Sequence, residues 1–261
     1  MALTRPQGAS RSFGIIATII GMAATPLFAQ PALAGGAPAV GTVPPVITVT
    51  GNVFDPFNRA PVVGAEVAFT STEGGRPLAT ATSDPAGVYS VSLETGGKPL
   101  DVYVRATAAG RVTSLIFPPE SLTSDLAPCP PFAGTTGCIL VAMLTAPAAG
   151  LVASFADIER DPTKGEVLFI AADCKGTPVA GATIAISRQP ERLVYTHGPF
   201  PNPPAQGTDS SGRAFAFNIE PGRATIRARY PDGSIGVAHV LVEAGAITIA
   251  SALPLNAQCG R

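Results

Sequence analysis

Apolar and polar residues alternate along most of the chain beyond residue 45, at the period of two that is typical of a β-strand with one buried face. The clearest case lies within 82–93, where Tyr89, Val91 and Leu93 alternate with a valine and two serines. The letters before this strand, D-P-A-G, have the composition of a tight turn, because Asp can bond its own backbone, Pro presets φ and Gly accepts a positive φ. The stretch therefore predicts a turn that leads directly into a strand.

Similar alternation predicts short strands in two blocks, 46–145 and 165–261. The expected strands are 46–54, 67–69, 78–83, 88–93, 102–106, 112–117 and 139–144 in the first block, and 167–172, 184–186, 215–219, 224–230, 237–242 and 246–255 in the second. Short strands separated by turns are the pattern of a β-sandwich, so we expect an all-β chain of two tandem sandwich modules. We expect 146–164 to be a linker, within which 151–159 fits either a bridging strand or one short helical turn.

Four sequence markers recur in the same order in the two blocks. They are 61–65 with 178–182 (P-V-V-G-A and P-V-A-G-A), 84–87 with 209–212, 93–96 with 219–222, and 104–106 with 226–228. The second block has one more residue between Gly212 and Ile219 than the first has between Gly87 and Leu93. Since one extra residue reverses the side-chain phase of a strand, we expect a β-bulge there. The second block also has a longer proline-rich loop at 188–206.

These markers carry a resemblance to a known family. The P-V-x-G-A segment, followed by a T-x-D-x-x-G turn and a strand with Tyr89 or Phe215, resembles the carboxypeptidase regulatory-like domain, a small transthyretin-like or prealbumin-like sandwich. The match is good over 46–117, whereas 165–255 departs by its long loop and extra strand residue and fits a generic bacterial Ig-like domain nearly as well. The resemblance implies two tandem Ig-like or transthyretin-like sandwiches, the second divergent, of the kind used as non-catalytic modules of exported proteins. It brings no catalytic residues to transfer.

The first 34 residues are typical of a cleaved secretory signal peptide. Arg5 and Arg11 precede an apolar run at 13–22 that is too short to span a bilayer, and the letters A-L-A end the segment. An uncleaved membrane anchor is the alternative. We expect a flexible leader at 35–45, no membrane span in the mature chain, and export to the periplasm or the extracellular space.

Composition supports this picture and excludes one class of partner. The chain has 28 Gly, 27 Pro and only 13% charged residues, which fits many turns and short strands. Signal cleavage would leave 15 of the 17 basic residues and all 18 acidic ones, a net charge of −3. Nucleic-acid binding requires a clearly basic face, so we expect no nucleic-acid partner.

The four cysteines, all after the signal segment, predict disulfides in an exported chain. Of the three possible pairings we favour Cys129 with Cys138, which closes a small loop, and Cys174 with Cys259, which joins the start of the second module to the chain end. The longer loop would contribute about 3–5 kcal/mol of stability by loop entropy. A metal site is the alternative, but no C-x-x-C occurs and the histidines are distant in sequence. We expect no metal and no cofactor.

Few residues offer catalytic chemistry, and we predict no enzyme and no catalytic residue. The only histidines are His197, in the proline-rich loop, and His239, within a predicted strand. A hydrolase would need one of them beside a nucleophile. The best placed carboxylates, Asp84 and Asp209, occupy equivalent turns in separate modules, and the turn role explains both.

The proline-rich loop is the candidate binding site. It brings Tyr195, His197 and Phe200 together, and loops on rigid scaffolds often carry binding. The alternative is a rigid edge connection whose prolines discourage aggregation.

The sequence thus predicts an exported, non-catalytic structural or interaction protein of the bacterial envelope or the extracellular space. Its partner would be an unknown envelope protein or polysaccharide. The alternative is a carbohydrate- or peptide-binding module that uses loop 188–206, and a third option is an unrecognised hydrolase.

Overall fold

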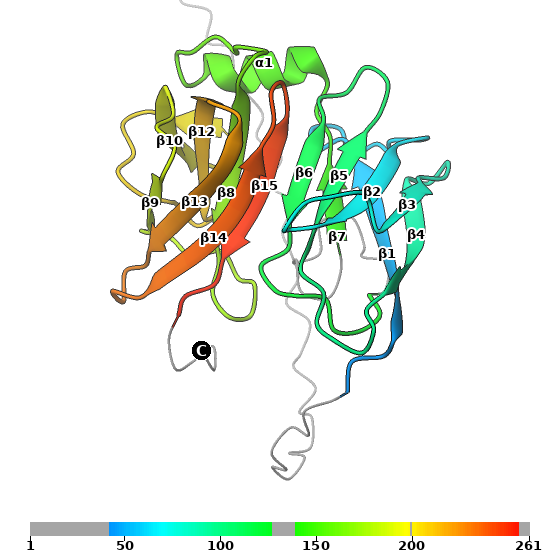
Figure 1. Cartoon of the computed structure of the whole chain (residues 1–261). Helices are drawn as coiled ribbons and strands as arrows, with labels where there is room; N and C mark the ends of the chain where they lie inside the picture. The colour runs from blue at the N-terminus through cyan, green and yellow to red at the C-terminus, as the bar shows by residue number, and fades with distance from the viewer. Residues whose placement is uncertain (1–41, 127–138, 199, 256–261) are drawn as a thin grey trace, which may run out of the picture. The chain divides into compact units, whose positions relative to one another are not determined.

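Strands make up nearly all of the regular structure in the computed structural model, which describes residues 42–126, 139–198 and 200–255 (Figure 1). The predicted signal peptide lies outside these residues. The elements are β1 (Val46–Phe54), β2 (Glu66–Ser71), β3 (Ala79–Thr82), β4 (Val88–Glu94), β5 (Val102–Thr107), β6 (Ser114–Phe117), β7 (Ile139–Ala142), α1 (Ala146–Ser154), β8 (Gly165–Ala171), β9 (Thr183–Ile186), β10 (Arg192–His197), β11 (Phe200–Asn202), β12 (Arg213–Ile219), β13 (Gly222–Arg229), β14 (Ile235–Val242) and β15 (Ile247–Ala252). The all-β prediction is confirmed.

The first module is a sandwich of two sheets. One has the strand order β4-β1-β7, and the other contains β6-β5-β2-β3. Tyr89, Val91 and Leu93 all point into the core between them, as their alternation predicts, while Ser90 and Ser92 are exposed. Inward-facing valines from both sheets complete this core, which is the usual construction of a β-sandwich.

The second module repeats this architecture with one difference. Its smaller sheet has the order β14-β13-β9, and the facing strands are β11-β10-β12-β8-β15. In the first module β3 pairs with β2, but in the second the hairpin of β10 and β11 joins the other sheet by pairing with β12. The predicted loop 188–206 is therefore largely a β-hairpin, which widens one sheet of the second sandwich.

The two recurring turns have the same geometry, which confirms the internal repeat. Gly87 and Gly212 both adopt a positive φ, of 76° and 68°. A Cβ atom at Gly87 would lie 2.5 Å from the carbonyl oxygen of Val53, and one at Gly212 would lie 2.4 Å from that of Ala171. Each turn thus needs glycine for its backbone conformation and for its close approach to the first strand of its module.

A hydroxyl beside each turn makes an equivalent pair of hydrogen bonds. The Ser83 hydroxyl accepts from the backbone N–H of Ala65 at 2.9 Å and donates to the carbonyl of Val62 at 2.6 Å. Thr208 makes the matching bonds to the second P-V-A-G-A segment, at 2.9 and 2.7 Å. The P-V-x-G-A segment and the turn therefore recur together because one hydroxyl connects them.

The β-bulge expected from the extra residue of the second module is also confirmed. The pairing of β12 with β8 shifts register between Ala216 and Ile219, and Asn218 between them has a φ of 53°. The Asn218 side chain accepts from the backbone N–H of Asp161 at 2.9 Å and donates to the carbonyl of Glu159 at 2.8 Å. The bulge thus directs a polar side chain onto the segment that precedes β8.

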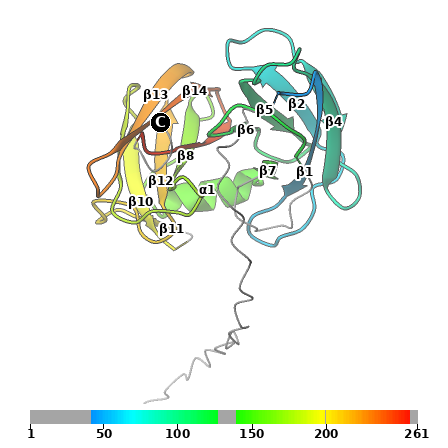
Figure 2. The same cartoon turned by 90° about the horizontal axis from the view of Figure 1, so that it is seen from below.

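The segment 146–164, predicted to be a linker, is folded onto the second module. It contains α1, whose first turn is capped by the Thr145 hydroxyl accepting from the N–H of Ala148 at 3.3 Å. Side chains of α1 and the residues after it pack against β10 and β12. Figure 2 shows the helix beside these strands. The residues of this cluster are Val152, Ala153, Ala156, Val194, Phe215 and Phe217. The helix therefore covers one face of the sheet.

Strands β6 and β15 pair in parallel and join the two modules. Their register runs from Ser114 opposite Ile247 to Phe117 opposite Ala250. The result is one nine-stranded sheet of order β11-β10-β12-β8-β15-β6-β5-β2-β3. Periodicity alone does not predict this pairing. All described residues belong to one compact unit.

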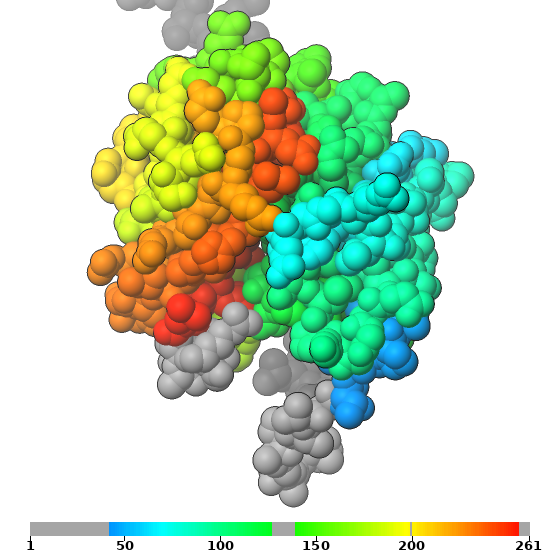
Figure 3. Space-filling view, viewed as in Figure 1, coloured from blue at the N-terminus to red at the C-terminus, as the bar shows by residue number. Residues whose placement is uncertain are grey.

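Side chains reinforce the junction between the modules. Tyr103, Leu115 and Phe117 of the first module belong to the core cluster of the second, and the rings of Tyr103 and Phe117 stack with centroids 5.1 Å apart. Arg223 of β13 donates to two carbonyls of the β2–β3 turn, those of residues 72 and 73, at 2.8 and 2.6 Å. Figure 3 shows this cyan turn against the orange surface of β13 and β14.

Candidate functional site

The predicted binding loop places its three candidate residues in different environments. Tyr195 lies on β10 with only 9% of its surface exposed, and its hydroxyl accepts from the backbone N–H of Ile184 at 3.0 Å. Tyr195 is therefore part of the core cluster of the second module. His197 and Phe200 are exposed at the end of the same hairpin.

Phe200 belongs to an exposed apolar surface that includes α1. Its ring lies against that of Phe155, with centroids 4.6 Å apart, and Leu151 lies one helical turn before Phe155. Exposed fractions are 36% for Phe200, 43% for Phe155 and 52% for Leu151. We call these three residues the α1–β11 patch. His197 pairs directly with Phe200 across the hairpin, so both side chains lie on one face of it.

A polar network ties this hairpin to the second recurring turn. The Asp209 carboxylate accepts from the backbone N–H of Gly198 and from the hydroxyl of Ser211, both at 2.6 Å. The hydroxyls of Ser211 and Thr196 are 3.0 Å apart. Partial burial opposes ionisation of Asp209, but the hydrogen bonds and the nearby His197 outweigh it and hold the pKa of this carboxyl below its usual value. The network orders the end of β10.

This network lacks the connection that a serine hydrolase needs. A hydroxyl nucleophile is activated by a hydrogen bond to a base, commonly histidine. Ser211 donates instead to Asp209, and within the described part of the chain no hydrogen bond joins a hydroxyl to His197. The other imidazole, that of His239, lies on the smaller sheet, 3.1 Å from the hydroxyl of Thr225. No group of three or more potential metal ligands occurs among the described residues.

The other turn carboxylate, Asp84, has the turn role that the sequence predicts. Its side chain accepts from the backbone N–H groups of Ala86 at 2.9 Å and Val88 at 2.8 Å. These bonds close the turn that leads into β4.

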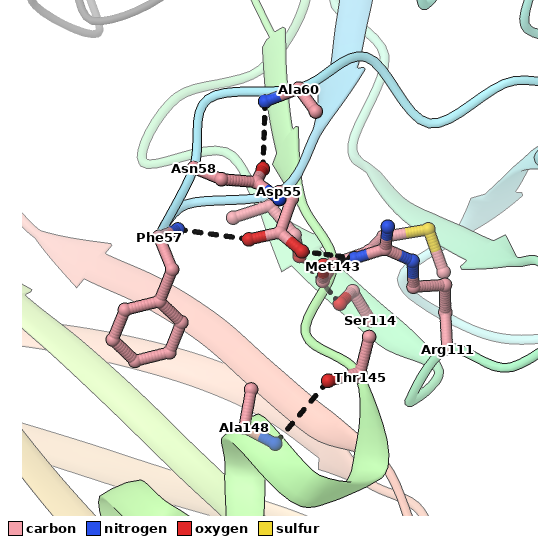
Figure 4. Close-up of polar contacts among 10 residues, drawn as sticks. Asp55, Phe57, Asn58, Ala60, Arg111, Ser114, Met143, Thr145 and Ala148 are labelled. Carbon is pink, nitrogen blue, oxygen red and sulfur yellow. Dashed lines mark hydrogen bonds and ion pairs between the residues drawn. The ribbon is translucent and has the colours of Figure 1, made fainter.

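A buried ion pair lies in the first module, beside the start of α1 (Figure 4). Asp55 pairs with Arg111, whose guanidinium also donates to the carbonyl of Met143 at 3.1 Å. The same carboxylate accepts from the backbone N–H of Phe57 at 2.9 Å. Burial raises the pKa of Asp55, but the bond from Arg111 and those from the backbone overcome it and leave that pKa lowered. The pair fastens the turn after β1 to the end of β7.

A second buried carboxylate, Glu166 on β8, pairs with Arg160. Here desolvation prevails over the attraction of the guanidinium, and the pKa of Glu166 is raised. Together with the bulge, this pair holds the segment between α1 and β8 against the sheet.

The cysteine pairing stays a prediction. Cys174 follows β8 and is not a free thiol. Cys129, Cys138 and Cys259 lie outside the described residues.

Comparisons with known proteins give distant structural likeness only. No family model and no curated protein matches the chain, so the carboxypeptidase regulatory-like resemblance has no support from them. The Bacillus anthracis TIE protein is similar with 14% identity and a TM-score of 0.28, over 80% of this chain and 34% of that one. This chain thus spans about a third of its length.

Two pilins are similar at the same level. The shaft pilin SpaA of Lactobacillus rhamnosus GG has 14% identity and a TM-score of 0.24, over 81% of this chain and 98% of that one. The minor pilin GBS52 of Streptococcus agalactiae has 13% identity and a TM-score of 0.26, over 80% and 97%. With TM-scores below 0.5, these likenesses carry no argument about function. In the described part of the chain, no helix has the length and apolar character needed to cross a membrane.

Proposed function

We propose that this chain is an exported, non-catalytic structural or interaction protein of the cell envelope or the extracellular space. The observation that carries the proposal is the shared nine-stranded sheet. Modules connected by a flexible linker move independently, whereas a continuous sheet makes two sandwiches one rigid body. A rigid two-sandwich body suits a spacer or a scaffold that presents surfaces at a fixed separation.

Strands β6 and β15 each have a neighbour on both sides in the nine-stranded sheet, and buried hydroxyls on them are paired. Ser114 on β6 and Thr248 on β15 are 1% and 0% exposed, and each donates to a carbonyl at 2.7 Å. Buried polar groups must be paired to be tolerated, and these are paired. Strands β6 and β15 therefore have the buried environment of central strands and not that of two exposed edge strands.

Cell fractionation tests the proposal. We expect the native protein in the envelope or the medium, with an N-terminus produced by cleavage after Ala34. An unprocessed chain in the cytoplasm would contradict export and the proposed function with it.

A second candidate function is binding of a carbohydrate or a peptide through the α1–β11 patch, and the exposed pair of Phe155 and Phe200 favours it. Aromatic side chains of this kind provide large contact areas. Replacement of Phe200 with Ser should abolish co-sedimentation with envelope polysaccharide or protein. Phe57→Ser is a matched control, since Phe57 is 46% exposed in the other module. Equal retention by both variants would remove this candidate.

A further inference from the structure

The outer face of the smaller sheet in the second module carries a row of arginines. Arg223, Arg227 and Arg229 occupy alternate positions of β13 together with Thr225. All three arginines are exposed and Thr225 is half-buried, while the alternate residues 224, 226 and 228 are buried. Side chains at every second position of a strand lie on one face, about 7 Å apart. The row therefore extends along one straight strand.

The strands on each side of this row present polar and aliphatic side chains, among them the exposed Ile235 of β14, which is opposite Arg229. Thr225 is opposite His239 on β14, and Arg227 is opposite Val237 on β14 and Ala185 on β9. A shallow hollow of about 480 Å³ lies here. Its lining includes Ala185, Ser187, Thr225, Arg227, Val237 and His239.

The arginines of this face form no ion pair in the described part of the chain, although the exposed Glu73 lies with Arg223 and His239 at the lining of a neighbouring pocket. Arg223 donates only to backbone carbonyls. Glu243, just beyond β14, pairs with Arg105 of the first module at 2.9 Å. A net-acidic chain thus concentrates unpaired cations on one flat face.

We infer that this arginine face, defined by Arg223, Arg227, Arg229 and His239, binds a strand of anionic polysaccharide. Guanidinium groups form paired hydrogen bonds with carboxylate and sulfate oxygens, and hydroxyls along the hollow suit a hydrated sugar chain. A protein partner would call for aromatic anchors in a dry centre, and the hollow offers none. Single-stranded nucleic acid would call for stacking aromatics as well as charge.

An anionic polysaccharide would be the partner of the proposed interaction protein. This inference rests on the proposed function in one respect only, that the exported protein and the polysaccharide would meet in the envelope or outside the cell. Binding in solution is independent of export, so a failure of one can be distinguished from a failure of the other.

The test measures binding of the purified protein to polygalacturonate and heparin, with dextran as the uncharged control, at several salt concentrations. We expect both polyanions to bind and dextran not to bind. Arg227→Gln/Arg229→Gln should weaken binding about tenfold and lower the slope of log affinity against log salt by about 1.4.

Arg192→Gln/Arg213→Gln is the matched control, because it removes the same charge from the opposite sheet of the same module. It should change affinity less than about twofold, since distant charges are largely screened at physiological salt. Equal losses in the two variants, absence of polyanion binding at low salt, or tighter binding of an oligothymidylate than of polygalacturonate would each overturn the inference.

Discussion

Single side chains fix the local geometry of both modules. The clearest are the hydroxyls of Ser83 and Thr208, each of which satisfies one buried donor and one acceptor of the preceding P-V-x-G-A segment. Removal of such a hydroxyl lowers the stability of the fold, because its backbone partners stay buried without a hydrogen bond.

Thr208→Val keeps the shape of the side chain and removes its hydroxyl. We expect a loss of about 2–3 kcal/mol in the free energy of unfolding, measured by urea denaturation, because two buried backbone groups lose their partner. The matched control is Thr225→Val on the exposed sheet face, which should cost no more than about 0.5 kcal/mol. Equal effects would show that the Thr208 bonds do not stabilise the fold.

The ion pair of Asp55 predicts a dependence of stability on pH. The pKa of Asp55 is lowered in the folded state, so its stabilisation is present above the unfolded value, near 3.8, and is lost as pH falls through the folded pKa. At pH 7, Asp55→Asn should lower the free energy of unfolding by about 3 kcal/mol. The largely buried Arg111 then loses its charged partner and keeps the bond to the carbonyl of Met143. The measurement is urea denaturation of both proteins across acidic pH.

The stability difference between wild type and Asp55→Asn should shrink below about pH 4, because the wild-type carboxyl then becomes protonated as well. Asp84→Asn, in an exposed turn, provides the comparison for general acid effects. A difference that stays constant down to pH 2 would contradict the assigned ion pair.

At the scale of elements, the sequence predicts most of the strands and the bulge, but it treats β10 and β11 as a loop and offers only a short helical turn or a bridging strand at 151–159, where α1 ends. Alternation identifies β4 because one face of that strand is buried and the other is exposed. The segment 146–164 is predicted as a linker, yet Thr145 as N-cap with Pro147 in the first turn is a helix-start signal in the sequence. The burial of Tyr195 cannot be read from periodicity, because β10 is covered on both faces, by α1 and by the core, and its pattern does not alternate.

The bulge gives a prediction that separates backbone strain from hydrogen bonding. Asn218→Gly keeps the positive φ and loses the bonds to 159 and 161, so we expect a loss of about 1–2 kcal/mol. Asn218→Ala loses the same bonds and adds left-handed strain, which should cost about 1 kcal/mol more. Urea denaturation of the two variants measures the difference. An Ala variant as stable as the Gly variant would show that the strain is relieved elsewhere.

At the scale of the whole molecule, the two modules are joined through one sheet. The β6–β15 pairing joins segments more than 130 positions apart, and periodicity within either segment gives no information on which strand lies beside it. The one available signal is that S-L-I-F and I-T-I-A-S-A are nearly continuous apolar runs, which are typical of parallel strands buried on both faces. The α1–β11 patch cannot be predicted from local sequence, because it is formed only in the folded chain. Its two aromatic rings, those of Phe155 and Phe200, are 45 positions apart in the sequence.

Hydrogen exchange at β6 and β15 tests this union most directly. Amides in the centre of a sheet open only with global unfolding, whereas those of edge strands open locally. We predict that peptides covering 114–117 and 247–252 exchange as slowly as those of β1 and β8. Rapid exchange of β6 and β15, with β1 and β8 still protected, would mean that the two sandwiches are separate bodies.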